Sequence, residues 1–391
     1  MSVSGGNELA FHNAVGPKPY IRTHNAIRGC AAIGVFCYHL QLEKTYRIPL
    51  GLIAPLVTRG YVWVDLFFIL SGFVMSLTYQ QALSYADGRS FRAFISARIA
   101  RIFPLHLFAL GYLAALIIGV EAIASIAGRQ PHWAALTGHD FHNLGLQAAL
   151  VQIWDAKATM SWNIPSWSLS AEMHVYLVLP FIAVALRMAP RLTLAVLALV
   201  VSAIYAGLLI HYRSLDILTP VALLRCFAGF TLGVIIQQHR RALAGLSDRS
   251  LTVMQGMAAT ATVAILLSPL HDVWVILPFA LLVAATSPDR GFLCRLLAGG
   301  WQQRLGDTSY SIYLLNFPVL ITAGTIWPKI QPLLGRLNVE AGKIIWMALL
   351  LAILLALSRL SFRYIEQPLR KKTFNALVGK RPYRSAPART G

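Results

Sequence analysis

Charged residues are scarce in this sequence. Only 13% of its 391 residues are Asp, Glu, Lys or Arg, about half the roughly 25% that is typical of soluble domains. This deficit excludes a cytosolic enzyme and a disordered chain. Cysteines are also few, which excludes a disulfide scaffold. The four that occur lie in or beside apolar segments without metal-site spacing, so we interpret them as packing residues: Cys30, Cys37, Cys226 and Cys294.

Apolar residues make up 57% of the chain, and the mean hydropathy is +0.61. Apolar runs of about 20 residues indicate membrane spans. The sequence therefore predicts an all-α, polytopic bundle of about ten transmembrane helices. The stretch 122–170 contains no run long enough to cross, so we expect a re-entrant or interfacial segment there. The expected spans lie near 24–42, 61–80, 103–121, 171–187, 193–211, 220–238, 252–268, 273–287, 305–327 and 344–363.

The distribution of positive charge predicts the orientation. With the termini inside, the inner segments hold 22 Lys and Arg and the outer loops hold 9. This bias places both termini in the cytoplasm. We expect a cytoplasmic segment 1–23, a transmembrane domain 24–363 and a basic cytoplasmic tail 364–391. We interpret the excess of positive charge as orienting the protein in the membrane and contacting anionic lipid. Because the sequence has no motif that reads a nucleic-acid groove, we predict no nucleic-acid partner.

The first expected span carries two polar residues that are costly at membrane depth. Arg28 and His39 are eleven residues apart. On an α-helix this spacing places both on one face, about 16–17 Å apart along the axis. Singly, Arg28 could extend to the inner headgroups and His39 could be an interfacial histidine. Together they favour a functional channel, with a cation at the inner entrance and a titratable imidazole deeper in.

Further polar residues lie at the edges of the next spans. Asp65 needs His39 or an arginine as a partner, because an unpaired carboxylate in apolar surroundings would protonate. Ser71 is small enough to allow close helix approach. Arg98 and Arg101 share a helix face, where they either anchor the inner side or form a fork for phosphates.

Glu172 stands at the start of the fourth expected span. It either caps that helix or faces a cavity beside His39. Two histidines on an outer loop, His139 and His142, are too few for a metal centre, so we predict no metal site.

In this order, the residues resemble the acyltransferase 3 family of integral membrane O-acyltransferases, over about residues 20–372. The chain departs from the family pattern at Asn25 and Met173, where acids are frequent, and at Asn316, where a histidine is common. The motifs that carry the resemblance are Arg28 with His39, Asp65–Phe73, Arg98 with Arg101, Pro165–Glu172 with Tyr176, Arg225–Gly233, Ser309–Leu314 and Tyr364–Pro368.

The resemblance implies transfer of an acyl group, by default acetyl from acetyl-CoA, to a sugar hydroxyl of an envelope or exported glycan. We predict that His39 is the general base, because an imidazole titrates near neutral pH. Glu172 or Asp65 would orient its ring. An acyl-histidine intermediate is the open alternative to direct transfer.

The donor site is predicted at Arg98, Arg101 and Ser71, with Arg28 guiding the pantetheine arm or polarising the carbonyl. We expect acyl-CoA as a co-substrate and no permanently bound cofactor. The expected location is the bacterial inner membrane, with the lipid bilayer as a partner. Four further residues are assigned to the acceptor site: Trp167, Ser168, Tyr176 and Arg225.

The sequence does not identify the acceptor, because the outer loops contain no motif that indicates a particular substrate. Lipopolysaccharide, exopolysaccharide, a lipid-linked sugar and a small glycoside all suit the pattern, and the sequence does not indicate an oligomeric state. A proton-coupled transporter or flippase of an anionic lipid or glycan is the competing function, since it would use the same polar face. A scaffold without activity would explain the spans but not the polar residues within them.

Overall fold

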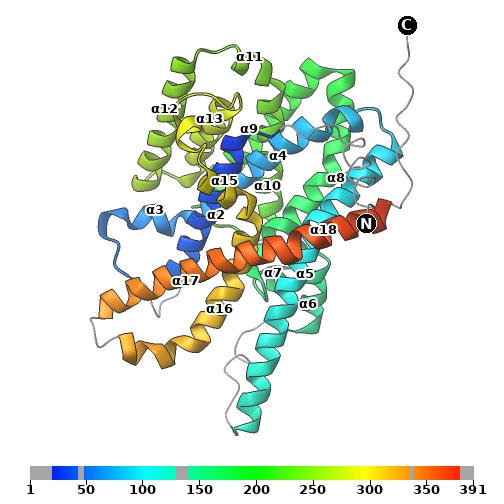
Figure 1. Cartoon of the computed structure of the whole chain (residues 1–391). Helices are drawn as coiled ribbons and strands as arrows, with labels where there is room; N and C mark the ends of the chain where they lie inside the picture. The colour runs from blue at the N-terminus through cyan, green and yellow to red at the C-terminus, as the bar shows by residue number, and fades with distance from the viewer. Residues whose placement is uncertain (1–19, 43–47, 129–139, 219, 335–338, 379–391) are drawn as a thin grey trace, which may run out of the picture.

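Figure 1 shows a computed structural model of the chain, in which residues 20–42, 48–128, 140–218, 220–334 and 339–378 are described. Every regular element in these ranges is helical, which confirms the predicted all-α class. The α-helices are α2 (Arg22–Leu42), α3 (Ala54–Thr58), α4 (Trp63–Leu83), α5 (Gly88–Ile126), α6 (Phe141–Ala148), α7 (Ala156–Thr159), α8 (Trp167–Met188), α9 (Pro190–His211), α10 (Val221–Gln238), α11 (Arg240–Ala244), α12 (Asp248–Leu267), α13 (Ile276–Thr286), α14 (Phe292–Leu296), α15 (Gly300–Asp307), α16 (Ser309–Leu334), α17 (Val339–Ser361) and α18 (Gln367–Val378). The 3₁₀ turns are η1 (Gly51–Ile53), η2 (Gly60–Val62), η4 (Gln152–Trp154), η5 (Ile164–Ser166) and η6 (Asp272–Val275), and Phe362–Glu366 forms a π-helix, η7.

Within the described residues, eight helical segments are long and apolar enough to cross a membrane. Helix α2 is long enough but too polar on average to be counted with them, and the segment Asp272–Thr286 is apolar but shorter. These two correspond to the expected spans 24–42 and 273–287. The count of ten crossings and the cytoplasmic side of the termini remain predictions. The eight segments are Gly51–Leu83, Gly88–Ile126, Ile164–Met188, Pro190–His211, Val221–Gln238, Asp248–Leu267, Ser309–Leu333 and Glu340–Val378.

The largest difference from the expected spans is in α5. The sequence predicted a separate inner segment before a span at 103–121, but one helix continues from Gly88 to Ile126 through both, with Pro104 inside it. Its first turn is capped by Asp87, which accepts hydrogen bonds from the backbone of Arg89 and Ser90. These bonds hold the pKa of the exposed Asp87 carboxyl below its usual range.

Short helices and turns follow α5 as far as α8. In the described part of the stretch 122–170, α6, η4, α7 and η5 are each too short to cross, in line with the expected interfacial or re-entrant segment. The segment nevertheless has a buried side, because His106 of α5 and the backbone carbonyl of Gln147 lie within hydrogen-bond distance at 2.8 Å. Residues 129–139, which include His139, lie outside the described residues.

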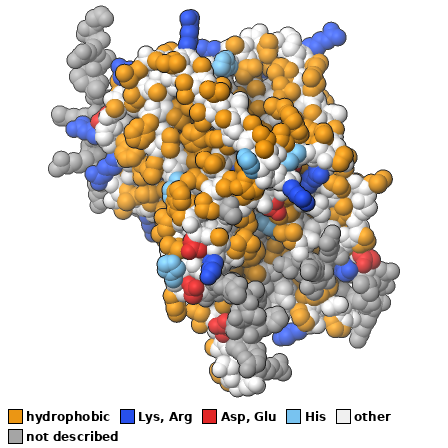
Figure 2. All heavy atoms as spheres, turned by 180° about the vertical axis from the view of Figure 1, so that it is seen from behind, with side chains coloured by type: hydrophobic (Ala, Val, Ile, Leu, Met, Phe, Trp, Pro, Cys, Tyr) orange, Lys and Arg blue, Asp and Glu red, His pale blue; other side chains and the backbone are white. Residues whose placement is uncertain are grey.

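The outer surface is rich in apolar side chains. Figure 2 shows hydrophobic groups spread over much of one face, with Lys and Arg mostly near its edges. Large residues such as Phe181, Leu199 and Leu277 are more than 60% exposed, which would be unfavourable in water and is expected beside lipid tails. The molecule is a multi-pass integral membrane protein. The end of the basic tail, residues 379–391, lies outside the described residues.

Helices α4 and α10 pack closely through small residues in the centre of the bundle. Gly72 of α4 faces the backbone of Phe230, and Gly233 of α10 faces the backbone of Ile69 and Phe73. A Cβ at either glycine would overlap main-chain atoms, so only glycine allows this separation of the two helices. The contact fixes the position of α4, which carries Asp65 and Ser71.

We expect Gly72→Ala to destabilise the folded protein, because the added methyl group meets backbone that cannot rotate away. Overpacking of this kind costs about 1–3 kcal/mol or more. The measurement is the thermal unfolding midpoint of detergent-purified protein. Gly119→Ala is the matched control, since the space around Gly119 of α5 is open. Equal midpoints for the two variants would contradict the packing argument.

Candidate active site

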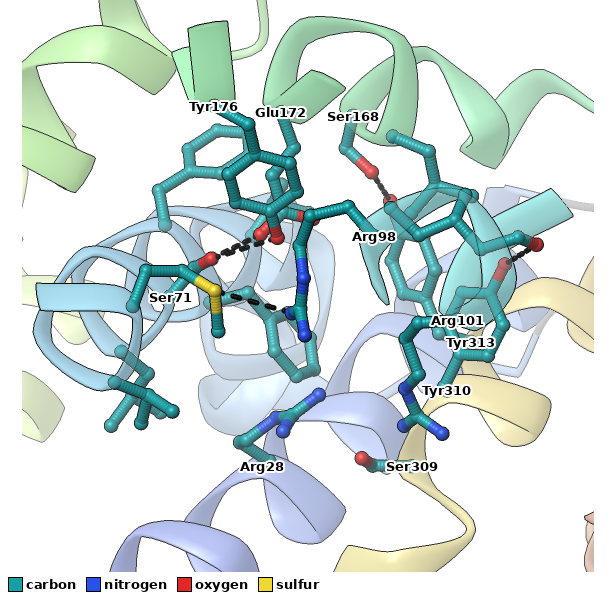
Figure 3. Close-up of a pocket in the computed structure, with 18 residues that line it drawn as sticks. Arg28, Ser71, Arg98, Arg101, Ser168, Glu172, Tyr176, Ser309, Tyr310 and Tyr313 are labelled. Atoms are coloured by element: carbon teal, nitrogen blue, oxygen red, sulfur yellow. Dashed lines mark hydrogen bonds between the residues drawn. The ribbon is translucent and has the colours of Figure 1, made fainter. Parts of the chain in front are cut away.

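A polar cavity of about 120 Å³ lies among α2, α4, α5, α8 and α16 (Figure 3). Most of its polar lining comes from residues that the sequence had singled out. The structure thus brings together all four predicted donor-site residues, which are spread over three helices. The lining includes Arg28, Ser71, Arg98, Arg101, Ser168, Glu172, Tyr176, Ser309, Tyr310 and Tyr313.

The guanidinium groups of Arg28, Arg98 and Arg101 point into the same space (Figure 3). Arg98 is almost fully buried and donates to the hydroxyl of Tyr79 at 3.1 Å. Its guanidinium carbon also lies 5.8 Å from the ring centre of Tyr176. Aromatic rings contact its flat faces, so Arg98 is held in place without a carboxylate partner of its own among the described residues.

Arg101 is paired with Glu366 of the π-helix η7. Glu366 is 1% exposed and also accepts a hydrogen bond from Ser311 at 2.8 Å. Arg370 of α18 adds a further positive charge that acts on both Arg98 and Arg101. The sequence analysis gave Glu366 no role, although it lies in one of the motifs that carried the family resemblance.

Arg28 differs from the other cavity arginines. Among the residues that the structure describes, none forms a hydrogen bond or ion pair with its guanidinium, which lines the cavity near the charge of Glu172. Since Arg101 is neutralised by Glu366, the remaining lining carries two guanidinium groups against one carboxylate. The cavity therefore has a positive excess and a guanidinium that is free to receive an anion.

Glu172 lies in the cavity but not beside His39. Its carboxylate accepts a hydrogen bond from Ser71, and the Ser71 Oγ is 3.2 Å from the hydroxyl of Tyr176. The prediction that Glu172 or Asp65 orients the His39 ring is therefore wrong. Glu172 pairs with Ser71, and Asp65 pairs with Arg225. Which neighbouring helix a side chain faces cannot be predicted from residue spacing along its own helix.

His39 is oriented by a neutral amide instead. Asn316 of α16 donates from Nδ2 to the backbone carbonyl of Tyr313 at 2.6 Å, which turns its Oδ1 toward His39. The Nδ1 of His39 lies 3.1 Å from this oxygen and must be the donor, because an amide oxygen only accepts. In the neutral ring the proton is thus on Nδ1, and Nε2 has a lone pair and no hydrogen bond from the described residues. The histidine itself is absent from the cavity lining.

Asp65 has the arginine partner that the sequence allowed for. Arg225 of α10 donates from Nε and one terminal nitrogen to its two carboxylate oxygens at 2.7 and 2.6 Å. Both side chains are fully buried, and the guanidinium carbon of Arg225 lies 5.5 Å from the ring centre of Trp167. The pair engages both Asp65 oxygens and two of the three Arg225 nitrogens, and the acceptor role predicted for Arg225 stays a prediction.

The remaining predicted acceptor residues lie at one side of the cavity. Ser168 and Tyr176 of α8 line it directly, whereas Trp167 packs behind them against Phe68. The hydroxyl groups of Ser168 and Tyr313 are 2.7 Å apart. Within the described residues no group of three or more His, Cys, Asp or Glu side chains could hold a metal ion.

We expect Arg225→Met to destabilise the protein by about 3–5 kcal/mol, because the buried Asp65 carboxyl loses its partner and must either stay charged in the core or take up a proton. The double variant Asp65→Leu with Arg225→Met removes both charges and should recover most of that loss. Thermal unfolding in detergent measures both. A single variant as stable as the wild type would show that the pair does not hold α4 against α10.

The fold and the cavity define a multi-pass helical membrane protein with a buried, positively charged site. The chain belongs to the acyltransferase 3 family, because the family model described as an acyltransferase domain matches residues 24–363. It is therefore a membrane acyltransferase, as the order of its motifs predicted.

Curated relatives agree with this assignment. Acyltransferase MdmB of Streptomyces mycarofaciens is 27% identical over 75% of this chain and 77% of that protein. The peptidoglycan O-acetyltransferase OatA of Listeria monocytogenes is 24% identical over 91% of this chain and 57% of that protein. An O-acetyltransferase OatA of Staphylococcus aureus is 24% identical over 95% and 60%. The chain thus spans less than two thirds of these OatA proteins. No solved structure matches it.

Proposed function

We propose that this protein transfers an acyl group, acetyl by default, from acyl-CoA to a hydroxyl group of an envelope or exported glycan in the bacterial inner membrane. One observation carries the proposal: α2 contributes Arg28 to a cavity with a positive excess, and the same helix carries His39, whose ring is oriented by Asn316. A glycan acceptor is favoured by the similarity to a protein named a peptidoglycan O-acetyltransferase.

The cavity would bind the donor. Acyl-CoA carries phosphates, and guanidinium groups are well suited to them because each presents several N–H donors in one plane. Arg98 is held by rings and Arg28 is free to pair, so both can donate to a diphosphate without first losing an ion pair. In the predicted orientation Arg28, Arg98 and Arg101 lie near the cytoplasmic ends of their spans, on the side where acyl-CoA is made.

His39 would act as the general base. The Asn316 amide places the proton on Nδ1 and leaves the Nε2 lone pair for the proton of the acceptor hydroxyl. The hydroxyl oxygen forms a C–O bond at the thioester carbonyl carbon while the C–S bond breaks, and the proton passes through Nε2 to the departing CoA thiolate. Arg28, or another hydrogen-bond donor near it, stabilises the negative charge of the bound acyl-CoA.

The rise from Arg28 to His39, about 16–17 Å over eleven residues, is comparable to the length of a pantetheine arm. A diphosphate at the arginines would therefore leave the acyl group within reach of His39. The base and the anion site are thus separated by about the distance that the donor itself spans.

We expect His39→Gln to abolish acceptor acylation, because an amide keeps the size and hydrogen bonding of the side chain but cannot take a proton at neutral pH. The assay follows transfer from radiolabelled acetyl-CoA to a glycan acceptor and the release of CoA by purified protein. Unchanged unfolding behaviour of the variant shows that it is folded. Near-normal turnover would remove the base assignment, and movement of substrate across vesicles with the thioester intact would favour a transporter.

We expect Arg28→Ala to raise the KM for acetyl-CoA by about tenfold or more, since a hydrogen bond to a charged group contributes about 1.5–3 kcal/mol. The effect should shrink when the donor is a truncated acyl-pantetheine without phosphates. Arg295→Ala, at an exposed arginine of α14, is the control. Equal sensitivity with both donors would contradict phosphate binding at Arg28.

A further inference from the structure

Helix α18 returns the chain to the arginines of the donor cavity. Figure 1 shows α17 and α18 as one continuous rod that crosses α5. Glu366, in the π-helix between α17 and α18, pairs with Arg101 of α5. Phe374 of α18 packs against Ala97 and Ala100 of α5. One face of α18 therefore packs along the first half of α5.

Arg370 lies on this packed face. It follows Glu366 by four residues and precedes Phe374 by four, and side chains at this spacing lie above one another on a helix. Since both of these neighbours contact α5, Arg370 faces α5 as well, near the level of Arg98. It is half-buried there, and its positive charge acts on both Arg98 and Arg101.

Arg370 has no acidic partner among the residues that the structure describes. No carboxylate there lies within ion-pair distance of its guanidinium. Glu366, the nearest acid along the helix, is bonded to Arg101 and Ser311. Arg98, which Arg370 faces, lacks a carboxylate partner too. Like charges packed at one place repel each other, and an anion bound between them would offset that cost.

The direction of the helices places Arg370 relative to the rest of the site. Helices α16 and α17 are antiparallel, because Ser311 bonds to Glu366 while the rings of Trp327 and Trp346 are 5.6 Å apart. Residue numbers thus rise along α16 in the direction in which they fall along α17. Helix α18 continues in the direction of α17.

Arg370 and His39 therefore lie on opposite sides of the contact between Ser311 and Glu366. From that contact, α16 continues to Asn316, which orients His39, whereas α18 runs the other way to Arg370. In acyl-CoA, the pantetheine arm and the 3′-phosphoadenosine likewise lie on opposite sides of the diphosphate. A donor whose thioester points toward His39 has its 3′-phosphate on the side of Arg370.

We propose that Arg370 binds the 3′-phosphate of acyl-CoA and thereby selects CoA over donors that lack this group. The proposal rests on the proposed function, because it assumes that the diphosphate lies at Arg28 and Arg98. A phosphate monoester carries about 1.5–2 negative charges near neutral pH, and a guanidinium can donate to it from two nitrogens. The family model matches residues 24–363, so Arg370 lies outside the matched range.

The test measures the affinity of purified protein for CoA and for 3′-dephospho-CoA by isothermal titration calorimetry. In the wild type we expect CoA to bind about tenfold more tightly or more. In Arg370→Ala the affinity for CoA should fall to that for 3′-dephospho-CoA, which itself should not change. Lys372→Ala is the matched control, because Lys372 is an exposed cation on the opposite face of α18, and it should keep the wild-type ratio.

Two other roles for Arg370 give different results. A structural role would lower the thermal unfolding midpoint of Arg370→Ala and weaken the binding of both ligands equally. A contact with anionic lipid would also weaken both equally, and only in nanodiscs that contain phosphatidylglycerol as well as phosphatidylcholine. Either result would overturn the proposal. We expect neither, because removing a repelled charge should leave the midpoint unchanged or raise it.

An affinity ratio near one in the wild type, or a ratio that persists in Arg370→Ala, would overturn the proposal while acyl transfer continued. The predicted ratio without transfer of an acyl group to any acceptor would instead contradict the proposed function and leave the phosphate site standing. Arg370→Gln keeps the test decisive if Arg370→Ala does not fold, because glutamine retains part of the side chain without its charge.

Discussion

The cost of burying charge among apolar helices is the constraint on which this structure depends. A guanidinium at membrane depth is tolerated only with a partner or beside water, and removing one member of a buried pair is expensive. Arg225 is closed by Asp65 and Arg101 is paired with Glu366, so these residues join helices that are distant in sequence. Neither Arg28 nor Arg98 has such a carboxylate partner among the described residues, and Arg28 also lacks a hydrogen bond there, which is why we propose the anion site beside it.

Helix α16 connects the two halves of the site. Its residues pass from the arginine-rich cavity at Tyr310, through Tyr313, to the amide of Asn316 that orients His39. The neutral amide fixes the tautomer of the imidazole without adding a second charge to an apolar region. In the proposed function, the donor cavity and the partner of the general base would therefore lie along one helix.

The fold and the cavity residues could be predicted, because hydropathy identifies spans and charge in a span is costly enough to be informative. Arg28, Ser71, Arg98 and Glu172 do share one cavity. Their partners could not be predicted, because a partner depends on how neighbouring helices are rotated. Three points were missed for this reason: the Ser71 contact of Glu172, the pairing of Glu366 with Arg101, and the role of Asn316, whose amide the sequence analysis had noted only as a departure from histidine.

The central claim is that a donor bound at the arginines presents its acyl group to His39. A structure with a non-transferable acetyl-CoA analogue in a lipid nanodisc tests it most directly. We predict the diphosphate within about 2.7–3.1 Å of the Arg28 guanidinium. The carbonyl group should face Nε2 of His39. A diphosphate bound outside the cavity, or a His39 ring turned toward lipid, would contradict the account.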